Sequence, residues 1–506
     1  MVGCVLRLTC LLALALALVL SASADAATVK PPLRTSGARI VDEDGRTVVL
    51  QGVNWFGFET SAHVVHGLWS RDLDDMMGQI RRMGFNTIRL PFSLQALDST
   101  VPITGPDFSG GKNAALQGKT PQQAMDVVID AAARAGLMVL LENHSLADDG
   151  YQYPLWYGQA GYDETSWVAH WQALARRYAD KPNVIGADLK NEPHGDATWG
   201  DGGPTDWRRA ATRAGNAITA IAPNWLIVVE GIEKAVPGGR LDTHWWGGDL
   251  EGVRRHPVRL KRADRLVYSP HEYGPGVFPQ PWFGRPDTAR RLAQRWRDGW
   301  GFIAQERIAP LLIGEFGGRK VDLGSDEGRW QRQFLDHLAR TGISWTYWAL
   351  NPDSGDTGGV LSDDWTTPDR AKLALLQRTI ARQHIAFGGG SAAPAKPHPT
   401  RVSAPRPHPR PQVQNGLKAA VVVENQWDAG WCGHLEVTGT PGQDLSGATI
   451  GFTLPAGTRI TQTWNGQFSA TEGRVRVGLP AWARAPMTAT GFCVAGTGAA
   501  TDVRVG

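Results

Sequence analysis

The sequence predicts an α/β fold: a (β/α)8 barrel followed by a small antiparallel β-sandwich. Three observations lead to this prediction. Short apolar runs alternate eight times with amphipathic helical runs over about 300 residues, which is the arithmetic of a closed parallel barrel. A proline-rich stretch then interrupts every periodic pattern. Beyond it, six short strand-like runs are separated by Gly, Pro and Asn, as in a small sandwich.

The eight strands of the barrel are expected where apolar residues form unbroken runs, because strands covered on both faces are apolar along their whole length. They are residues 47–55, 86–92, 138–144, 184–193, 225–231, 266–273, 311–317 and 344–351. A doubly wound open sheet is the main alternative. Its nucleotide-binding version would carry G-x-G-x-x-G after an early strand, and no such motif follows one here.

Helical spacing is clearest in two of the intervening segments. There the apolar residues recur at i, i+3, i+4 and i+7, which places them on one face of a helix. The first set is Leu73, Met76, Met77, Ile80 and Met83. The second set is Trp167, Trp171, Leu174 and Tyr178.

Segment boundaries follow from composition. Residues 1–26 combine Arg7, an apolar run and small residues before Ala26, as a secretory signal peptide does, so a secreted, extracellular protein is expected. Residues 388–416 alternate proline with small and basic residues and contain no acid, so they form a semi-rigid linker. The barrel domain is therefore assigned to 27–387 and the sandwich to 417–506.

Composition excludes several function classes. Of the 506 residues, 42% are hydrophobic and 20% charged, which excludes a disordered chain. A net charge of +3 is too balanced for a protein that neutralises nucleic-acid phosphates. The 21 tryptophans outnumber both Phe (14) and Tyr (8), and such a supply of flat amphipathic rings favours stacking on sugars. We expect no nucleic-acid partner, no membrane span and a monomer.

The number and positions of the cysteines agree with a secreted protein. Cys4 and Cys10 would leave with the signal peptide, so that Cys432 and Cys493 remain, and two cysteines in an oxidising compartment most simply form one disulfide. No ligand set for zinc or an iron–sulfur cluster is present. We therefore expect neither a metal nor a cofactor.

Polar side chains cluster at the C-terminal ends of the predicted strands. They are Asn54, Arg89, His144, Asn191, Glu192, Glu230, His271, Tyr273, Glu315, Trp348 and Asn351. In a barrel these ends meet on one rim, where active sites lie. A buried strand that ends in a carboxylate is unfavourable unless the group is paired or functional, and here nearly every strand carries such a polar group.

Glu192 and Glu315 are the candidate catalytic pair. They follow the fourth and seventh strands and could face each other across the barrel mouth. Two carboxyl groups that flank a bond perform glycoside hydrolysis: one protonates the leaving oxygen, and the other attacks or activates water. Mutual repulsion should raise the pKa of one of them, while Arg89 and the Tyr273 hydroxyl are candidates to hold the other ionised.

These motifs together resemble glycoside hydrolase family 5, in particular its secreted bacterial endo-β-1,4-glucanases, over about residues 34–387. The matching runs are NTIRLPF, LLENHS, LKNEPH, SPHEYGP, IGEFGG and TYWALNPDSGDTGG. The resemblance implies a retaining mechanism with Glu192 as general acid/base and Glu315 as nucleophile. It further implies that Asn191 contacts the sugar 2-hydroxyl and that Trp348 forms the platform of the −1 sugar. The remaining orienting residues would be Arg89, His144, His271 and Tyr273. Glu230 receives no catalytic task.

Six further tryptophans fall in predicted rim loops, and about half of them are expected to line sugar subsites. They are Trp55, Trp156, Trp199, Trp245, Trp246 and Trp282.

The six strands predicted for the sandwich are 419–427, 434–440, 448–455, 458–464, 473–479 and 487–492. Trp427, Trp464 and Trp482 stand at turn-like or polar-flanked positions, where so large a ring marks a binding face. This region resembles carbohydrate-binding module family 2, and the resemblance implies that the three tryptophans form a flat cellulose-binding face. The family usually carries interior tryptophans where this chain has Ala448 and Gly451.

These features together predict a secreted endo-β-1,4-glucanase that acts on cellulose or a related β-1,4-glucan. The same fold and mechanism could instead act on mannan or xyloglucan. A non-enzymatic alternative is a polysaccharide-binding adhesin with an inactive barrel, against which the retention of both Glu192 and Glu315 argues.

Overall fold

The computed structural model describes residues 28–387, apart from 235 and 382, and residues 417–505, apart from 428–429, 441–442, 446, 465–466, 472, 480–482, 484, 486 and 497. The predicted signal peptide and linker lie outside the described residues. Within those residues, no helix combines the length and the apolar character needed to cross a membrane.

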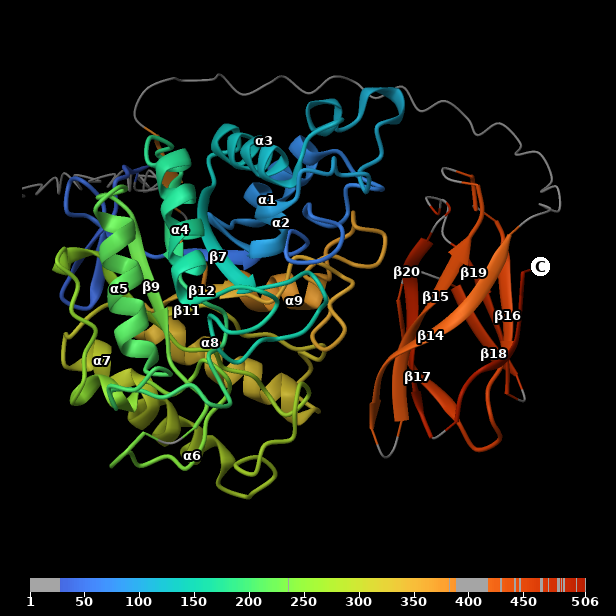
Figure 1. Cartoon of the computed structure of the whole chain (residues 1–506). Helices are drawn as coiled ribbons and strands as arrows, with labels where there is room; N and C mark the ends of the chain where they lie inside the picture. Colours follow the sequence, from blue (N-terminus) through green and yellow to red (C-terminus); the bar gives the residue numbers. More distant parts are fainter. Residues whose placement is uncertain are drawn as a thin grey trace, which may run out of the picture.

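The barrel is an eight-stranded parallel sheet in the order β10-β9-β8-β7-β6-β5-β12-β11 (Figure 1). The two end strands approach each other through a parallel bridge between Tyr268 and Leu311. The strands are β5 Gln51–Asn54, β6 Thr87–Ser93, β7 Met138–Ser145, β8 Val184–Asp188, β9 Leu226–Glu230, β10 Leu266–Ser269, β11 Leu312–Ile313 and β12 Ser344–Tyr347. All eight are buried along their length, as the apolar runs predicted, and the predicted fold class is confirmed.

Helices cover the outside of the barrel, and Figure 1 shows α4 and α5 side by side there. The helices are α1 Leu73–Met83, α2 Leu94–Asp98, α3 Pro121–Arg134, α4 Glu164–Tyr178, α5 Trp207–Thr219, α6 Thr288–Trp296, α7 Phe302–Gln305, α8 Asp326–Thr341 and α9 Arg370–Gln377. The apolar sets predicted in α1 and α4 are both buried, so the two predicted helical faces are confirmed. Local caps define the helix ends: Asp72 accepts from the backbone of Asp74 at the start of α1, and Gly84 at φ 104° ends it.

One predicted strand is divided in the structure. Residues 47–55 were expected to form a single strand, but β4 Thr47–Val48 belongs to a separate antiparallel sheet with β2 Arg34–Ser36 and β3 Arg39–Val41. The reason is that Val48 and Leu50 pack into a second apolar cluster at the N-terminal ends of the barrel strands, together with Val29 and Ile40. This cluster closes the end of the barrel opposite the predicted rim.

The first and last described segments of the barrel domain are joined. β1 Thr28–Val29 pairs in parallel with β13 His384–Ile385, and the Ala386 N–H donates to the Val29 carbonyl at 2.9 Å.

The C-terminal domain is built from two four-stranded antiparallel sheets in the orders β14-β15-β20-β17 and β18-β19-β16-β21. The strands are β14 Lys418–Trp427, β15 Gly430–Thr438, β16 Thr449–Thr453, β17 Arg459–Trp464, β18 Gln467–Thr471, β19 Arg474–Gly478, β20 Met487–Ala495 and β21 Thr501–Val505. The antiparallel sandwich is as predicted, but β18 and β21 were missed. Trp431 is buried in the core of this domain and donates from Nε1 to the Gly498 carbonyl at 2.8 Å.

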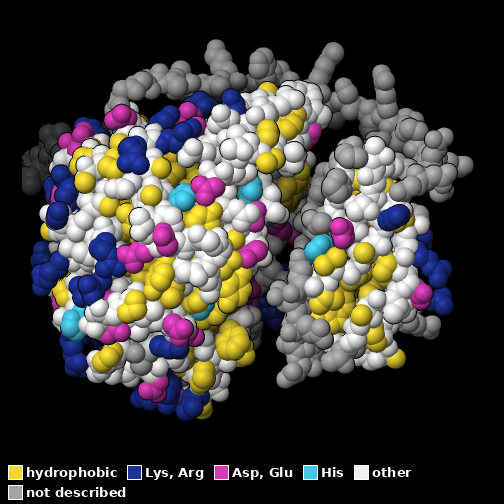
Figure 2. Space-filling model, viewed as in Figure 1, with side chains coloured by type: hydrophobic (Ala, Val, Ile, Leu, Met, Phe, Trp, Pro, Cys, Tyr) yellow, Lys and Arg dark blue, Asp and Glu magenta, His cyan; other side chains and the backbone are white. Residues whose placement is uncertain are grey.

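Both signs of charge occur across the visible face of the barrel domain (Figure 2), in keeping with the small net charge of the whole chain.

Candidate active site

A cavity of about 690 Å³ opens at the C-terminal ends of the barrel strands. Six of the residues predicted for the site line it: His144, Asn191, Glu192, Tyr273, Glu315 and Trp348. The other two, Arg89 and His271, have no exposed surface and lie beneath the lining, where they contact the two glutamates. The structure therefore brings all eight barrel residues together.

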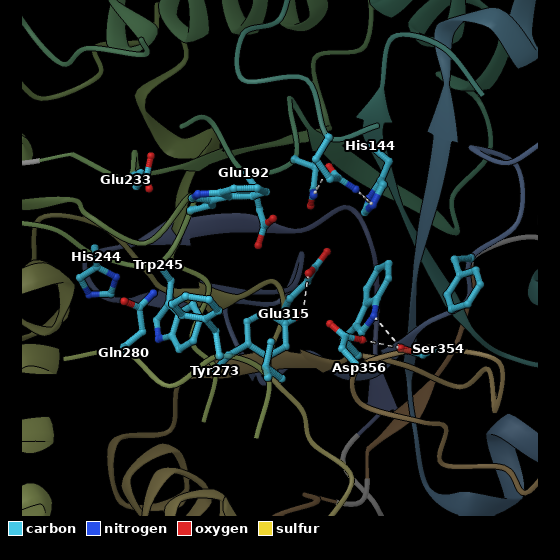
Figure 3. Close-up of a pocket in the computed structure, with 18 of the residues that line it drawn as sticks. His144, Glu192, Glu233, His244, Trp245, Tyr273, Gln280, Glu315, Ser354 and Asp356 are labelled. Carbon is cyan, nitrogen blue, oxygen red and sulfur yellow. Dashed lines mark hydrogen bonds between the residues drawn. The ribbon is translucent and has the colours of Figure 1, made fainter. Parts of the chain in front are cut away.

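The carboxyl groups of Glu192 and Glu315 point toward each other in the middle of this cavity (Figure 3). Glu192 is the fourth residue after the end of β8, and Glu315 is the second residue after the end of β11. One carboxylate oxygen of each glutamate and one ring nitrogen of His271 all lie within 4.8 Å of one another. The barrel thus places two acids from strands distant in sequence on opposite sides of one small volume.

Glu315 is held by a donor on each of its two oxygens. Arg89 Nη1 donates to Oε1 at 2.8 Å, and the Tyr273 hydroxyl donates to Oε2 at 2.7 Å. Burial by itself would raise the pKa of Glu315, but the positive charges of His271 and Arg89 outweigh it and lower that pKa below its ordinary value. Glu315 is therefore the carboxylate that stays ionised.

Glu192 lies in the opposite electrostatic environment. His271 Nδ1 donates to Oε1 of Glu192 at 3.0 Å. Burial nevertheless raises the pKa of Glu192 above its ordinary value, and the negative charge of Glu315 adds to the rise while His271 opposes it. When the pKa values of two neighbouring carboxyl groups are shifted in opposite directions, one group can act as an acid and the other as a base or nucleophile.

The backbone of Glu192 is strained. Its φ of +51° lies in the left-handed region, which a non-glycine residue adopts at an energetic cost on the order of 1–3 kcal/mol. The Glu192 N–H donates to Glu230 Oε2 at 2.7 Å, which holds this conformation. Glu230, to which the family resemblance assigns no catalytic task, therefore supports the backbone of Glu192.

Arg89 is the charge centre beneath the cavity. Besides Glu315, its guanidinium donates to Asp188 at 2.8 Å, Glu230 at 3.1 Å and the Asn191 side chain at 3.1 Å. Glu142 lies 3.5 Å away. A buried guanidinium has five N–H donors in a rigid planar arrangement, so it can hold several carboxylates in one geometry.

Asp188 and Glu142 were missed from the sequence as members of this network. The signal that could have identified them is an acidic residue inside an otherwise apolar strand. Glu142 precedes the strand-end residue His144 by two positions, and Asp188 precedes Asn191 by three. Both have no exposed surface.

His271 faces acids on more than one side. Its Nε2 lies 3.2 Å from Glu230, and Nδ1 contacts Glu192. Burial works against a charge on His271, but Glu230 and Glu315 outweigh it and hold its pKa well above the ordinary value. Glu192, His271 and Glu315 form the one group in the described residues with the spacing of a metal site. Because a His271 that carries both protons has no free lone pair, this donor set fits a cation poorly.

Aromatic rings stack at one end of the cavity. The Trp348 ring lies parallel to His144, with centroids 5.3 Å apart at 10°, and to Phe56, at 5.4 Å and 15°. Trp348 Nε1 donates to Ser354 Oγ at 3.2 Å, which fixes the indole plane. Burial would lower the pKa of His144, but the nearby Glu142 raises it to about 9, and His144 Nδ1 contacts Glu142 at 2.9 Å.

The predicted rim tryptophans divide into two groups. Trp245 and Trp246 line the cavity, and Trp246 is 39% exposed. The other four are buried packing residues: Trp55, Trp156, Trp199 and Trp282. About a third, rather than half, of the set therefore contributes to the cavity wall.

The candidate binding residues of the C-terminal domain are described only in part. Trp427 and Trp464 end β14 and β17, the two outer strands of one sheet, and Trp482 lies outside the described residues. Cys432 on β15 is the register partner of Cys493 on β20. The predicted disulfide stays a prediction, since the two side chains are not among those described.

Comparison with known proteins gives the family. Residues 41–354 match Cellulase (glycosyl hydrolase family 5). The chain belongs to glycoside hydrolase family 5. Residues 417–503 of this family 5 enzyme match Cellulose binding domain.

Similar proteins align with the family 5 domain over most of their own length. An endoglucanase from Paenibacillus polymyxa is 49% identical over 359 residues, which cover 71% of this chain and 89% of that protein. The major extracellular endoglucanase of Xanthomonas campestris is 38% identical over 411 residues, 79% of this chain and 82% of that protein.

Solved structures of similar proteins superpose on the barrel. The catalytic domain of the Xanthomonas campestris major endoglucanase aligns with a TM-score of 0.64 and 42% identity, covering 69% of this chain and 99% of that one. An endocellulase from Pyrococcus horikoshii, solved as a complex with cellotetraose, aligns with a TM-score of 0.64 and 40% identity, covering 69% and 98%.

Proposed function

We propose that this family 5 enzyme is a secreted endo-β-1,4-glucanase that hydrolyses internal β-1,4-glucosidic bonds of cellulose with retention of configuration. The observation that carries the proposal is the approach of the Glu192 and Glu315 carboxylates to within 4.8 Å, with pKa values shifted in opposite directions. Carboxyl groups about 5 Å apart leave no room for an intervening water, which favours double displacement. The names of the endoglucanase relatives support a glucan substrate.

In the first step Glu315 is the nucleophile. A carboxylate oxygen of Glu315 forms a bond to the anomeric carbon while the bond from that carbon to the leaving glycosidic oxygen breaks. Glu192 transfers its proton to that oxygen, so the leaving chain departs with a free hydroxyl. Arg89 and Tyr273, which hold Glu315 ionised, keep the nucleophile ready for this attack.

In the second step Glu192 works as a base. Its carboxylate takes a proton from water as the water oxygen bonds to the anomeric carbon, and the ester bond to Glu315 breaks. The product keeps its β configuration, and both glutamates regain their starting protonation states. The contact from His271 to Glu192 orients this carboxyl group for both steps.

Two residues are proposed to place the sugar. Trp348, which lies parallel to Phe56 and to His144, presents the platform of the −1 sugar. Arg89 donates to the side-chain oxygen Oδ1 of Asn191 at 3.1 Å and so orients that side chain. The side-chain amide of Asn191 is proposed to reach the sugar 2-hydroxyl.

Replacement of each glutamate tests the two roles. Glu315→Gln should abolish release of reducing sugar from carboxymethylcellulose and leave adsorption to cellulose intact. Glu192→Ala should be slow on cello-oligosaccharides but should accept azide as nucleophile on an activated aryl cellobioside, giving a β-glycosyl azide. Full activity of Glu315→Gln, or an α-configured azide, would refute the assignment. Comparison of carboxymethylcellulose with mannan tests the substrate class.

The remaining parts of the chain fit the same proposal. We propose a signal peptide at 1–26, a catalytic domain at 27–387, a linker at 388–416 and a cellulose-binding module at 417–506 in a monomer. Trp427, Trp464 and Trp482 would contact cellulose, and the register pairing of Cys432 with Cys493 supports a disulfide between them. Removal of 417–506 should lower activity on crystalline cellulose far more than on carboxymethylcellulose; equal losses would refute the targeting role.

A further inference from the structure

His194 makes a close parallel stack with a cavity-lining tryptophan. The ring centroids of His194 and Trp246 lie 3.8 Å apart at an interplanar angle of 6°. His194 is 7% exposed, whereas Trp246 is 39% exposed. One face of the indole therefore rests on the imidazole, and the tryptophan remains accessible from the cavity.

The same imidazole binds the backbone of Glu192. His194 Nδ1 lies 2.7 Å from the Glu192 carbonyl oxygen, and because a carbonyl only accepts, Nδ1 must carry the proton. Burial lowers the pKa of His194 below its ordinary value, although the bond to the Glu192 carbonyl opposes this. The ring is therefore a neutral donor at neutral pH.

The contact from His194 completes a clamp on a strained residue. Glu192 has a φ of +51°, its N–H is held by Glu230, and its carbonyl is held by His194. Gly247, next to Trp246, lies over the same backbone, since a Cβ added there would approach the Glu192 Cα at 3.2 Å. A backbone in an unfavourable conformation depends on such contacts to keep its side chain aimed.

The stacked pair lies toward the leaving-group side of the cavity. Figure 3 shows Glu192 and Glu315 between an end with His144 and Ser354 and an end with Glu233, His244 and Gln280. The Gly195 N–H, next to His194, donates to Glu233 at 3.0 Å, which places the stack at the second end. Trp348, the proposed −1 platform, belongs to the first end.

We propose that His194 is a positioning residue that couples the Trp246 face on the leaving-group side to the backbone of Glu192, and so aims the acid at the leaving oxygen. The inference rests on the proposed function, because it assumes that Glu192 donates the proton. His194 itself touches neither the sugar nor the reacting atoms. Its effect passes through one hydrogen bond and one ring stack.

Two substitutions separate these contacts. His194→Phe keeps a flat ring under Trp246 but removes the donor. His194→Asn keeps an N–H donor at the position of Nδ1 but removes the ring. If the hydrogen bond aims Glu192, His194→Phe should lower kcat/KM on cellotetraose about tenfold, which is part of the roughly 10²–10⁴-fold that general acid catalysis contributes, and His194→Asn should stay within about threefold of wild type.

The choice of leaving group shows whether the lost activity is proton donation. A 2,4-dinitrophenolate leaves without a proton, so kcat/KM of His194→Phe on 2,4-dinitrophenyl β-cellobioside should stay within about twofold of wild type. If His194 had only a structural role, His194→Phe would lower kcat/KM on both substrates by the same factor. The limb of the pH profile set by Glu192 should also shift in His194→Phe.

His170 offers a matched control. Its Nδ1 contacts the backbone carbonyl of Ser166 at 2.7 Å on helix α4, outside the cavity lining. His170→Phe should leave the ratio of the two substrates unchanged. Equal losses on both substrates in His194→Phe, no loss on either, or a His194→Asn variant as impaired as His194→Phe would overturn the positioning role.

A double-variant cycle tests the coupling through the stack. If His194 and Trp246 act as one unit, kcat/KM of the double variant His194→Phe/Trp246→Ala on cellotetraose should be no more than about twofold below that of the more impaired single variant. Multiplying losses would overturn the coupling. A wild-type enzyme inactive on cellotetraose would instead refute the proposed function, and this inference with it.

Discussion

Arg89 and Glu315 form an ion pair in which the arginine side chain has no exposed surface and the N–O distance is 2.8 Å. The same guanidinium contacts Asp188 and Glu230. Arg89 therefore contributes, with His271, to the ionisation of the nucleophile, and it balances the charge of the buried carboxylates in the barrel interior.

Arg89→Met should be severely destabilising, because it leaves several buried carboxylates without a counter-charge. We expect a loss of about 3–5 kcal/mol in the free energy of unfolding, measured by urea denaturation at neutral pH. Arg291→Met is the matched control, since the Arg291–Asp287 pair on α6 is exposed and should contribute less than about 1 kcal/mol. Similar losses in both variants would contradict the role of Arg89 as charge centre.

Tyr273→Phe should move the acid limb of the pH profile to higher pH. The Tyr273 hydroxyl donates to Glu315 and is one of the contacts that lower its pKa. Without that donor the ionised form is less stable and the pKa rises, so Glu315 becomes protonated, and inactive, at a higher pH. The measurement is kcat/KM against pH on an aryl cellobioside. An unchanged acid limb would show that Tyr273 does not tune the nucleophile.

Gly247→Ala should lower kcat, whereas a control variant with the same backbone cost should not. Gly247 has a φ of +66°, and an added Cβ would approach Glu230 Oε2 at 2.4 Å and the Glu192 Cα at 3.2 Å. Gly158→Ala is the control, because φ there is +86° and no neighbouring heavy atom of the described residues lies within 4 Å of the added Cβ. Both changes carry the backbone cost of about 1–2 kcal/mol, but only Gly247→Ala should displace Glu192 and reduce kcat. Equal kcat values in the two variants would contradict this reading.

Asp249→Asn should flatten the dependence of stability on pH. Burial raises the pKa of Asp249 to about 8, and its Oδ2 has no hydrogen-bond partner in the described residues. Between its unfolded pKa and about 8 the folded state holds a proton that the unfolded state has lost, so the free energy of unfolding falls as pH rises, by about 1.4 kcal/mol per pH unit at most.

Urea denaturation at pH 5 and pH 8 measures this effect. The wild type should lose more stability than Asp249→Asn between the two values. Asp196→Asn, at a side chain 87% exposed, should behave like the wild type. Parallel curves for wild type and Asp249→Asn would show that Asp249 ionises normally.

The positions of the barrel strands and the residues at their C-terminal ends could be predicted from the sequence, because strands buried on both faces are apolar throughout and end in polar groups. The pairing partners within the site could not. That Arg89 contacts Asp188, which is 99 residues away, depends on barrel closure and register, and no local pattern encodes these.

The missed strands have a local cause. In β18 Gln467–Thr471 the apolar content is low, and β21 Thr501–Val505 is a five-residue strand whose two apolar residues, Val503 and Val505, are only half-buried. Likewise, Trp55 and Trp246 both stood in predicted rim loops, yet one is completely buried and the other is 39% exposed. Burial in a loop depends on tertiary packing, which composition does not reveal.

The pairing of β1 with β13 means that the barrel domain begins and ends at the same place. Joining these ends by a short peptide and cutting the chain at an exposed outer loop would give a circular permutant that keeps every strand neighbour. Because both natural ends lie near the base closed by Val48 and Leu50, any cargo fused to either end is attached far from the mouth that receives the polysaccharide.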